Sequence, residues 1–386
     1  MTEFLSPISH SLRDVVSALP QHAIGKQLQL HDTSGFPDLD GVQLAILGIK
    51  EVRKDHSVDA LYPCFDNVRA SFYELFPGNW HLSIADLGDI HPGETVEDTY
   101  AAVKTVVSEL LQKQIIPIVI GGSQDLTFAL YRAYDDVKKM INLVNVDSRF
   151  DIGNADAPIH SCSYIGKMVV EQPYNLFNYT AIGYQSYFNS IEEIELLEKM
   201  YFDAYRLGEV AKNLSSVEPV MRDADLVSFD LKAIKSSDLS YTKISSPNGF
   251  DGREICAISR YAGLSNKVSC FGLFGIVDDQ VKTPTAMLLA QIVWYFIEGV
   301  TYRINDGDFT KESDFVTYRV PIDDEILVFK KSLLTERWWI ELPFISNVNN
   351  KLKRHTLLPC TQSDYERACR QEIPERWYKA RKKNEI

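Results

Sequence analysis

The sequence predicts a three-layer α/β/α fold built on a mainly parallel sheet, followed by a small C-terminal α+β appendage. Three observations predict it. Short apolar runs rich in β-branched residues recur along the chain, and helical patterns lie between several of them. After residue 305 the pattern changes to turn-forming residues followed by alternating residues. Strands that alternate with helices favour a parallel sheet that is covered on both faces.

Six apolar runs have the length and composition of strands that are buried on both faces. They span residues 44–49, 116–120, 141–146, 179–183, 226–231 and 268–276. Ligands of parallel α/β sheets bind beyond the carboxyl ends of the strands. Catalytic or binding residues are therefore expected directly after these runs.

Helices are indicated between the strands. Capping-box patterns at Thr95 and Ser190 predict helices over residues 96–113 and 191–200. The segment 286–303 is apolar on most faces, which predicts a buried helix. It is too short and too interrupted for a membrane span.

These patterns divide the chain into three parts. We expect residues 1–39 to form an N-terminal extension packed on the core, residues 40–305 to form the α/β domain, and residues 306–386 to form the appendage. The joint near residue 306 is rich in Asn, Asp and Gly, which favour turns.

Within the appendage, alternating residues over 315–329 predict a hairpin, and a helix is expected to begin at Pro374 and to have a basic end. Its aromatic and apolar stripe is either core or a surface that docks a protein partner. The stripe comprises Trp338, Trp339, Phe344 and Ile345.

The composition excludes several classes of protein. A formal net charge of −13 over 386 residues works against a broad phosphate-binding surface, so no nucleic-acid partner is expected. The first thirty residues contain no long apolar run, so we expect neither a signal peptide nor membrane insertion, and we expect a cytoplasmic protein. The six cysteines form no C-x-x-C pair, which favours buried free thiols.

Three of the strand ends carry the most informative motifs, namely GGSQD at 121–125, VDSRFD at 146–151 and SFDLK at 228–232. In this order they resemble GGDHS, DAHxD and SFDxD of the ureohydrolases, the family of arginase, agmatinase and formimidoylglutamase. The segments DNVRASFYELFPG, IADLGDI and PIVIGGS add to the likeness, which spans roughly residues 40–303. The resemblance implies an arginase-like fold and a homo-oligomer, a trimer or a hexamer.

The resemblance also implies two Mn²⁺ ions and a bridging hydroxide that attacks a guanidinium or similar carbon. Two such cations need a cluster of carboxylates and imidazoles. Carried over position by position, three of the six presumed ligands are kept and three are replaced. The aspartates Asp147, Asp151 and Asp230 remain, whereas Gln124, Arg149 and Lys232 stand at the other three positions.

These replacements change the expected chemistry. Arg does not lose its proton in a protein and a coordinating Lys would have to, so both repel a dication and both offer partners to aspartates. We therefore expect Arg149 and Lys232 to form a fixed ion-pair network with the three aspartates, with no metal cofactor. The chain would then be a non-catalytic binding or regulatory protein.

Two alternatives stay open. In the first, the three aspartates retain Mn²⁺ and the chain is an active hydrolase of a linear amidine or guanidine bond. In the second, Arg149 and Lys232 form an anion site for a small carboxylate, while a guanidine-like ligand remains possible. His160 is the candidate catalytic acid or base, with a hydrogen-bonded loop residue as the alternative. Gly275 stands about where the family carries a substrate-facing glutamate.

Overall fold

A computed structural model of the chain describes residues 1–55, 62–137, 140–239, 246–277, 281–343 and 357–385. Nine strands form the central sheet, namely β1 (Gln29–Leu30), β2 (Leu44–Ile49), β3 (Ile84–Ile90), β4 (Ile116–Gly121), β5 (Ile141–Val146), β6 (Leu176–Tyr184), β7 (Asp203–Arg206), β8 (Leu226–Asp230) and β9 (Cys270–Phe274). Their order is β1-β3-β2-β4-β9-β8-β5-β6-β7, and every neighbouring pair is parallel. The mainly parallel sheet is confirmed.

All six predicted strands are present, with ends that differ by a few residues. Strand β9 is shorter than predicted, and Gly275 directly after it has a φ of +93°, which is incompatible with an extended strand. Strand β3 was not predicted because two aspartates interrupt its apolar pattern. Both are buried in the structure, where the Arg69 guanidinium pairs with Asp86 at 2.9 Å and with Asp89 at 2.6 Å.

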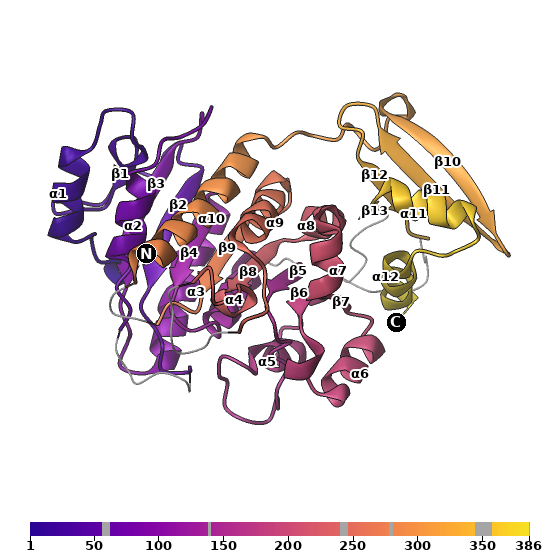
Figure 1. Cartoon of the computed structure of the whole chain (residues 1–386), viewed down its shortest axis with the longest axis horizontal. Coiled ribbons are helices and arrows are strands. Elements are labelled where there is room, and N and C mark those ends of the chain that lie inside the picture. Colours follow the sequence, from indigo (N-terminus) through magenta and orange to yellow (C-terminus); the bar gives the residue numbers. More distant parts are fainter. Residues whose placement is uncertain (56–61, 138–139, 240–245, 278–280, 344–356, 386) are drawn as a thin grey trace.

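Helices cover both faces of the sheet, as Figure 1 shows, and this confirms the three layers. One face packs against α1 (His10–Ala18), α2 (Asp66–Tyr73), α7 (Leu207–Lys212), α8 (Glu218–Asp223), α9 (Gly252–Leu264) and α10 (Thr283–Thr301). The other packs against α3 (Val96–Gln112), α4 (Leu126–Val137), α5 (Tyr164–Val170) and α6 (Ile191–Lys199). The predicted capping boxes are formed at Thr95 and Ser190.

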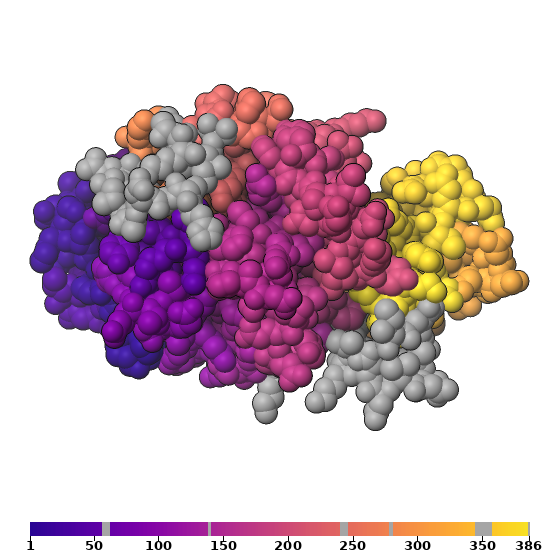
Figure 2. Space-filling model, turned by 90° about the horizontal axis from the view of Figure 1, so that it is seen from below, coloured from indigo at the N-terminus to yellow at the C-terminus, as the bar shows by residue number. Residues whose placement is uncertain are grey.

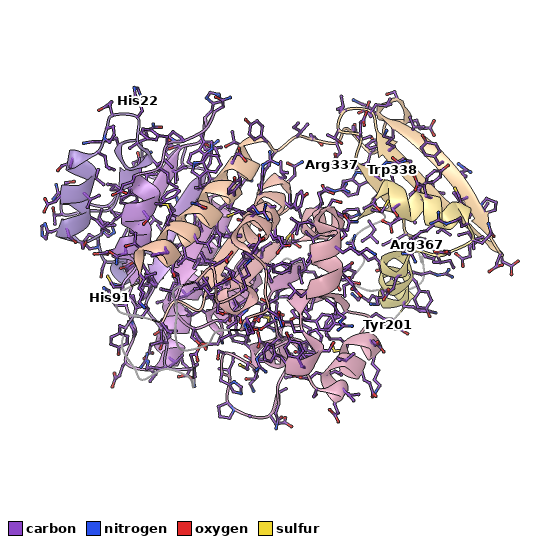
Figure 3. The ribbon with its side chains drawn as sticks, in the orientation of Figure 1. His22, His91, Tyr201, Arg337, Trp338 and Arg367 are labelled. Atoms are coloured by element: carbon purple, nitrogen blue, oxygen red, sulfur yellow. The ribbon has the colours of Figure 1, made fainter. Side chains whose placement is uncertain are left out.

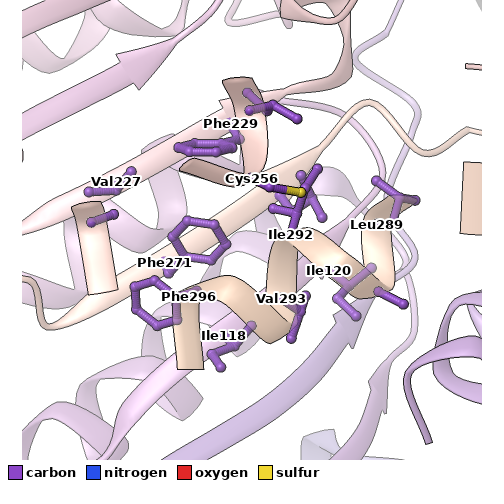
Figure 4. Packing of buried hydrophobic residues seen from close by; sticks show 14 of the residues in the cluster. Ile118, Ile120, Val227, Phe229, Cys256, Phe271, Leu289, Ile292, Val293 and Phe296 are labelled. Carbon is purple, nitrogen blue, oxygen red and sulfur yellow. The ribbon is translucent and has the colours of Figure 1, made fainter. Parts of the chain in front are cut away.

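The core under α10 explains why the predicted strands are continuous apolar runs. Phe271 of β9 stacks on Phe296 of α10 with ring centroids 4.3 Å apart, beside Phe229 of β8 (Figure 4). In β2, Leu44 and Ile46 belong to this cluster, whereas Ala45, Leu47 and Ile49 face the cluster on the opposite side. Both faces are therefore buried. Within the described part of the chain, no helix has the length and apolarity to cross a membrane.

The N-terminal residues extend the same sheet. Ser6 and Asp89 exchange two backbone hydrogen bonds of 2.9 Å, and β1 pairs with β3. Leu12 of α1 is buried in the cluster that also contains Val68 and Phe72 of α2. The edge of the sheet next to β3 is thus occupied by the chain's own first residues.

The appendage is a four-stranded antiparallel sheet with two helices, seen as the yellow and orange lobe in Figures 1 and 2. Its elements are β10 (Phe315–Ile322), β11 (Glu325–Ser332), β12 (Trp338–Glu341), β13 (Leu357–Cys360), α11 (Gln362–Cys369) and α12 (Glu375–Glu385). The predicted hairpin is confirmed as β10 and β11, and the predicted C-terminal helix is α12. Trp338 is core, because its ring stacks on Tyr318 and Tyr365 at 5.2 and 5.1 Å. Phe344 and Ile345 lie outside the described residues.

Candidate functional site

The strand-end motifs meet at the carboxyl edge of the sheet. Gln124 follows β4, Asp147 follows β5, Asp230 ends β8 and Gly275 follows β9. These four strands are consecutive in the sheet, in the order β4-β9-β8-β5. Residues that are up to 151 positions apart in sequence, Gln124 and Gly275, therefore lie at one edge, as parallel topology requires.

Asp147 and Asp230 have the same local geometry. One carboxylate oxygen of each, Oδ1, accepts the backbone N–H two residues later, from Arg149 at 3.0 Å and from Lys232 at 2.7 Å. These bonds fix the turns that follow β5 and β8. The other oxygen of each, Oδ2, is buried and finds no hydrogen-bond donor among the described residues.

Asp151 completes the group of aspartates. It has a φ of +53°, and its Oδ2 is also buried without a donor in the described part of the structure. Burial and the neighbouring Asp147 raise the pKa of Asp151 well above its usual value. Burial raises the pKa of Asp230 to about 7, although Lys232 opposes the shift. Asp151 and Asp230 therefore favour their protonated forms more than exposed aspartates do.

Lys232 lies among these aspartates. Its Nζ is 3.6 Å from Asp230 Oδ2 and 3.7 Å from Asp55 Oδ2, and its side chain is 12% exposed. Burial lowers the pKa of Lys232, but Asp230 and Asp55 outweigh that effect and raise it above the usual value. The predicted ion pair between Lys232 and Asp230 is confirmed. Asp55 was not anticipated, although it follows β2, whose carboxyl end lies at the same edge.

Arg149 does not join the network, so this part of the expected ion-pair cluster is wrong. Its Nη1 donates to the carbonyl of Phe188 at 2.9 Å, and its guanidinium carbon lies 4.8 Å from the centre of the Phe188 ring. No carboxylate of a described residue lies within ion-pair distance of it. A carbonyl and an aromatic face outside the aspartate group satisfy the guanidinium instead.

Gln124 and Gly275 are the remaining replaced positions. Gln124 is buried, and its Nε2 donates to Asn145 Oδ1 at 2.9 Å. A Cβ atom on Gly275 would lie 2.9 Å from Asp230 Oδ1, and the φ of +93° disfavours any side chain there. A glutamate at this position would therefore displace Asp230.

His160 lies in the loop between β5 and α5. Its backbone N–H donates to Ser163 Oγ at 3.0 Å, and its ring Nδ1 accepts the N–H of Cys162 at 3.2 Å. The neighbouring Cys162 was not anticipated. Burial raises the pKa of its thiol, and the charge of Lys232 opposes that shift. Among the residues that the structure describes, no group of three or more His, Cys, Asp or Glu is arranged to hold a metal ion.

Comparison with known proteins supports the resemblance. The family model described as the arginase family matches residues 60–298. A formimidoylglutamase of Streptococcus gordonii is 21% identical over 302 residues, which cover 72% of this chain and 90% of that protein. A formimidoylglutamase of Geobacillus thermodenitrificans is 32% identical over 81 residues, which cover 19% of this chain and 25% of that protein.

Solved structures agree on the fold. Trypanosoma cruzi formiminoglutamase with Mn²⁺ superposes with a TM-score of 0.63 at 18% identity, covering 73% of this chain and 99% of that one. The agmatine ureohydrolase of Thermoplasma volcanium gives a TM-score of 0.57 at 20% identity, with coverage of 75% and 98%. The family model spans more than half of the sequence, and the chain therefore belongs to the arginase family.

Proposed function

We propose that this chain is a non-catalytic binding or regulatory member of the arginase family, without a two-manganese centre, and that its site takes a small guanidine-like cation. One observation carries the proposal. Lys232, at the position of a presumed metal ligand, places its ammonium 3.6 Å from Asp230 and 3.7 Å from Asp55. The chain thus provides a positive charge of its own among the carboxylates.

Electrostatics argue against two divalent cations beside this lysine. A lysine coordinates a metal only after losing its proton, and Asp230 and Asp55 hold the pKa of Lys232 above its usual value. Charges that are taken out of water interact strongly, so an ammonium and a dication at the same carboxylates oppose each other. Gln124, Arg149 and Gly275 offer neither an imidazole nor a carboxylate in place of the family's residues.

The buried oxygens indicate the ligand class. The Oδ2 atoms of Asp147 and Asp151 are buried and receive no hydrogen bond from a described residue, and Asp230 Oδ2 has only the Lys232 ammonium, at 3.6 Å. Leaving such an oxygen unsatisfied costs about 1 to 3 kcal/mol. A guanidinium or amidinium group is flat, cationic and carries several N–H donors, so it matches the two oxygens of Asp147 and Asp151 that lack a donor. A carboxylate held jointly by Arg149 and Lys232 is less well supported, because Lys232 faces two aspartates and Arg149 is bonded to Phe188.

A second candidate is a hydrolase that uses one metal ion. The three aspartates supply oxygens of a type that binds a single Mn²⁺, although among the described residues they are not arranged to hold one without movement. A bound dication would lower the pKa of a coordinated water. In this version Lys232 would be a neighbour of the metal rather than its replacement.

The test combines binding and turnover. The purified chain, with and without MnCl₂, is incubated with agmatine, L-arginine or N-formimidoyl-L-glutamate, and release of urea or formamide is measured. We expect no release above background, and we expect agmatine or arginine to raise the melting temperature without Mn²⁺. Turnover on the order of 1 per second or more contradicts the proposal and favours the hydrolase.

A matched pair of variants locates the binding. Asp230→Asn removes a charge from the aspartate group, whereas Asp156→Asn removes one from an exposed position in the loop after β5. We expect the ligand-induced stabilisation to disappear in Asp230→Asn and to persist in Asp156→Asn. Equal stabilisation in the two variants would place the ligand elsewhere and contradict the assignment.

A further inference from the structure

The seam between the α/β domain and the appendage contains a cavity of about 850 Å³ that is open to solvent on one side. Its walls include Ile116 at the start of β4 and Val268 before β9, so it lies at the amino edge of the sheet, opposite to Asp230. The appendage contributes Phe309, Arg337 and Trp339, and Figure 3 labels Arg337 on the side that faces the core. Its volume is typical of small-molecule sites.

Most of the charges in the wall neutralise one another. Three of its four cations have carboxylate partners within ion-pair distance, namely Arg222 with Glu218, Arg337 with Glu218 and Asp306, and Lys267 with Asp223 and Asp225. Arg222 also donates to the carbonyls of Trp338 and Cys360, at 3.2 and 2.9 Å, and so ties the appendage to α8. The wall is therefore held in place by the protein's own pairs.

Arg303 differs from these three. Its Nε and Nη2 donate to the carbonyls of Gly263 and Val268 at 2.8 and 2.9 Å, and no described carboxylate lies within ion-pair distance of it. Burial lowers the pKa of Arg303 to about 10. A half-buried guanidinium without a counter-ion is partly desolvated, and a bound anion would offset that penalty.

An aromatic corner lies in the same cavity. The rings of Phe309 and Trp339 meet edge to face, 5.0 Å apart, and the guanidinium of Arg222 lies 4.9 Å from the Trp339 ring. The indole N–H of Trp339 is buried, and none of the described residues accepts a hydrogen bond from it. Buried Trp N–H groups usually have a partner. The corner thus combines flat apolar surface with a donor that lacks an acceptor.

We propose that this cavity is a second ligand site, which binds a small aromatic carboxylic acid. The carboxylate pairs with Arg303, the ring packs against Phe309 and Trp339, and the indole N–H donates to an oxygen of the ligand. Because both the α/β domain and the appendage line the cavity, the ligand stabilises their contact. The site is independent of the one at the carboxyl edge.

The first test compares an acid with its neutral analogue on the unmodified chain. Isothermal titration with 2-naphthoate is expected to give one site per chain with a Kd on the order of 0.1 mM. The uncharged 2-naphthamide, of nearly the same shape, is expected to bind at least about tenfold more weakly, since it cannot pair with Arg303. Equal affinities, or no binding of the acid, would overturn the proposal.

Variants then assign the site. Arg303→Met should weaken 2-naphthoate binding by about tenfold or more, whereas Arg253→Met, at a 94% exposed arginine on α9, should leave it unchanged. Trp339→Phe keeps a ring and removes the N–H, so we expect it to weaken 2-naphthoate binding several-fold. If Arg303→Met does not fold, this variant tests the site instead. Unchanged affinity in both wall variants, or loss in Lys232→Met instead, would show that the acid binds elsewhere.

Discussion

The two edges of the sheet differ in the sign of the charged groups that have no close partner among the described residues. At the carboxyl edge, three aspartates leave an oxygen without a donor in the described structure, and Lys232 supplies one ammonium. At the amino edge, the described acids neutralise every cation of the seam cavity except Arg303. A charge that the chain leaves uncompensated indicates the sign of what binds there. The comparison therefore supports both proposals, a cation at the family's site and an anion at the seam.

The largest effect should follow from removing the ammonium at the carboxyl edge. Lys232→Met leaves Asp230 and Asp55 without this partner, and breaking a buried ion pair costs about 3 to 5 kcal/mol. We expect a clear fall in the urea midpoint. Lys235→Met is the matched control, because that lysine pairs with Asp238 at 3.6 Å while 32% exposed, and it should lose well under 1 kcal/mol. Similar losses would show that Lys232 is not part of a buried network.

At the amino edge, Arg222→Met should lower the free energy of unfolding by nearly as much. The variant loses charged hydrogen bonds to Trp338 and Cys360, and each such bond contributes about 1.5 to 3 kcal/mol. Limited proteolysis should then release the appendage more quickly. Arg367→Met, which breaks an exposed pair with Glu372 inside the appendage, should not change the rate. Equal rates in the two variants would mean that Arg222 does not tie the two parts together.

Restoring family ligands should reverse the preference at the carboxyl edge. In the double variant Arg149→His with Lys232→Asp, two positive charges are replaced by a neutral imidazole and a carboxylate. We expect low stability without metal and recovery of about 2.7 kcal/mol when free Mn²⁺ reaches a hundred times its Kd. Thermal denaturation across a Mn²⁺ series measures this, with Mg²⁺ as the control ion. A melting temperature of the double variant that does not change with Mn²⁺ would contradict the positional assignment of these ligands.

The smallest effect is expected from Arg149→Ala. The side chain donates one charged hydrogen bond to the Phe188 carbonyl and lies against its ring, so its removal should cost about 1.5 to 3 kcal/mol, less than the loss of the two such bonds of Arg222. The difference from Lys232→Met in parallel denaturation curves is the informative quantity. A loss as large as that of Lys232→Met would show that Arg149 does neutralise the aspartates.

Much of the fold could be predicted from sequence, because strands buried on both faces are continuous apolar runs. Strand β3 could not be predicted, because its own residues do not reveal that Arg69, fifteen or more positions earlier, neutralises Asp86 and Asp89. The positions at the site could be carried over by motif, and topology brings them together. The direction in which a side chain points could not be predicted from the motif, as Arg149 shows. The hydrogen bond to Asp147 fixes the backbone of Arg149 but not its side chain. The guanidinium therefore binds the carbonyl of Phe188 rather than an aspartate.

The central claim is that Lys232 and its carboxylate partners replace a two-manganese centre. The most direct measurement is the metal content of the unmodified chain after equilibration with excess Mn²⁺ and removal of free ion, determined by elemental analysis against protein concentration. The account predicts clearly less than one equivalent of Mn²⁺ per chain, and the same value for Asp156→Asn. Two tightly bound Mn²⁺ ions per chain would contradict it.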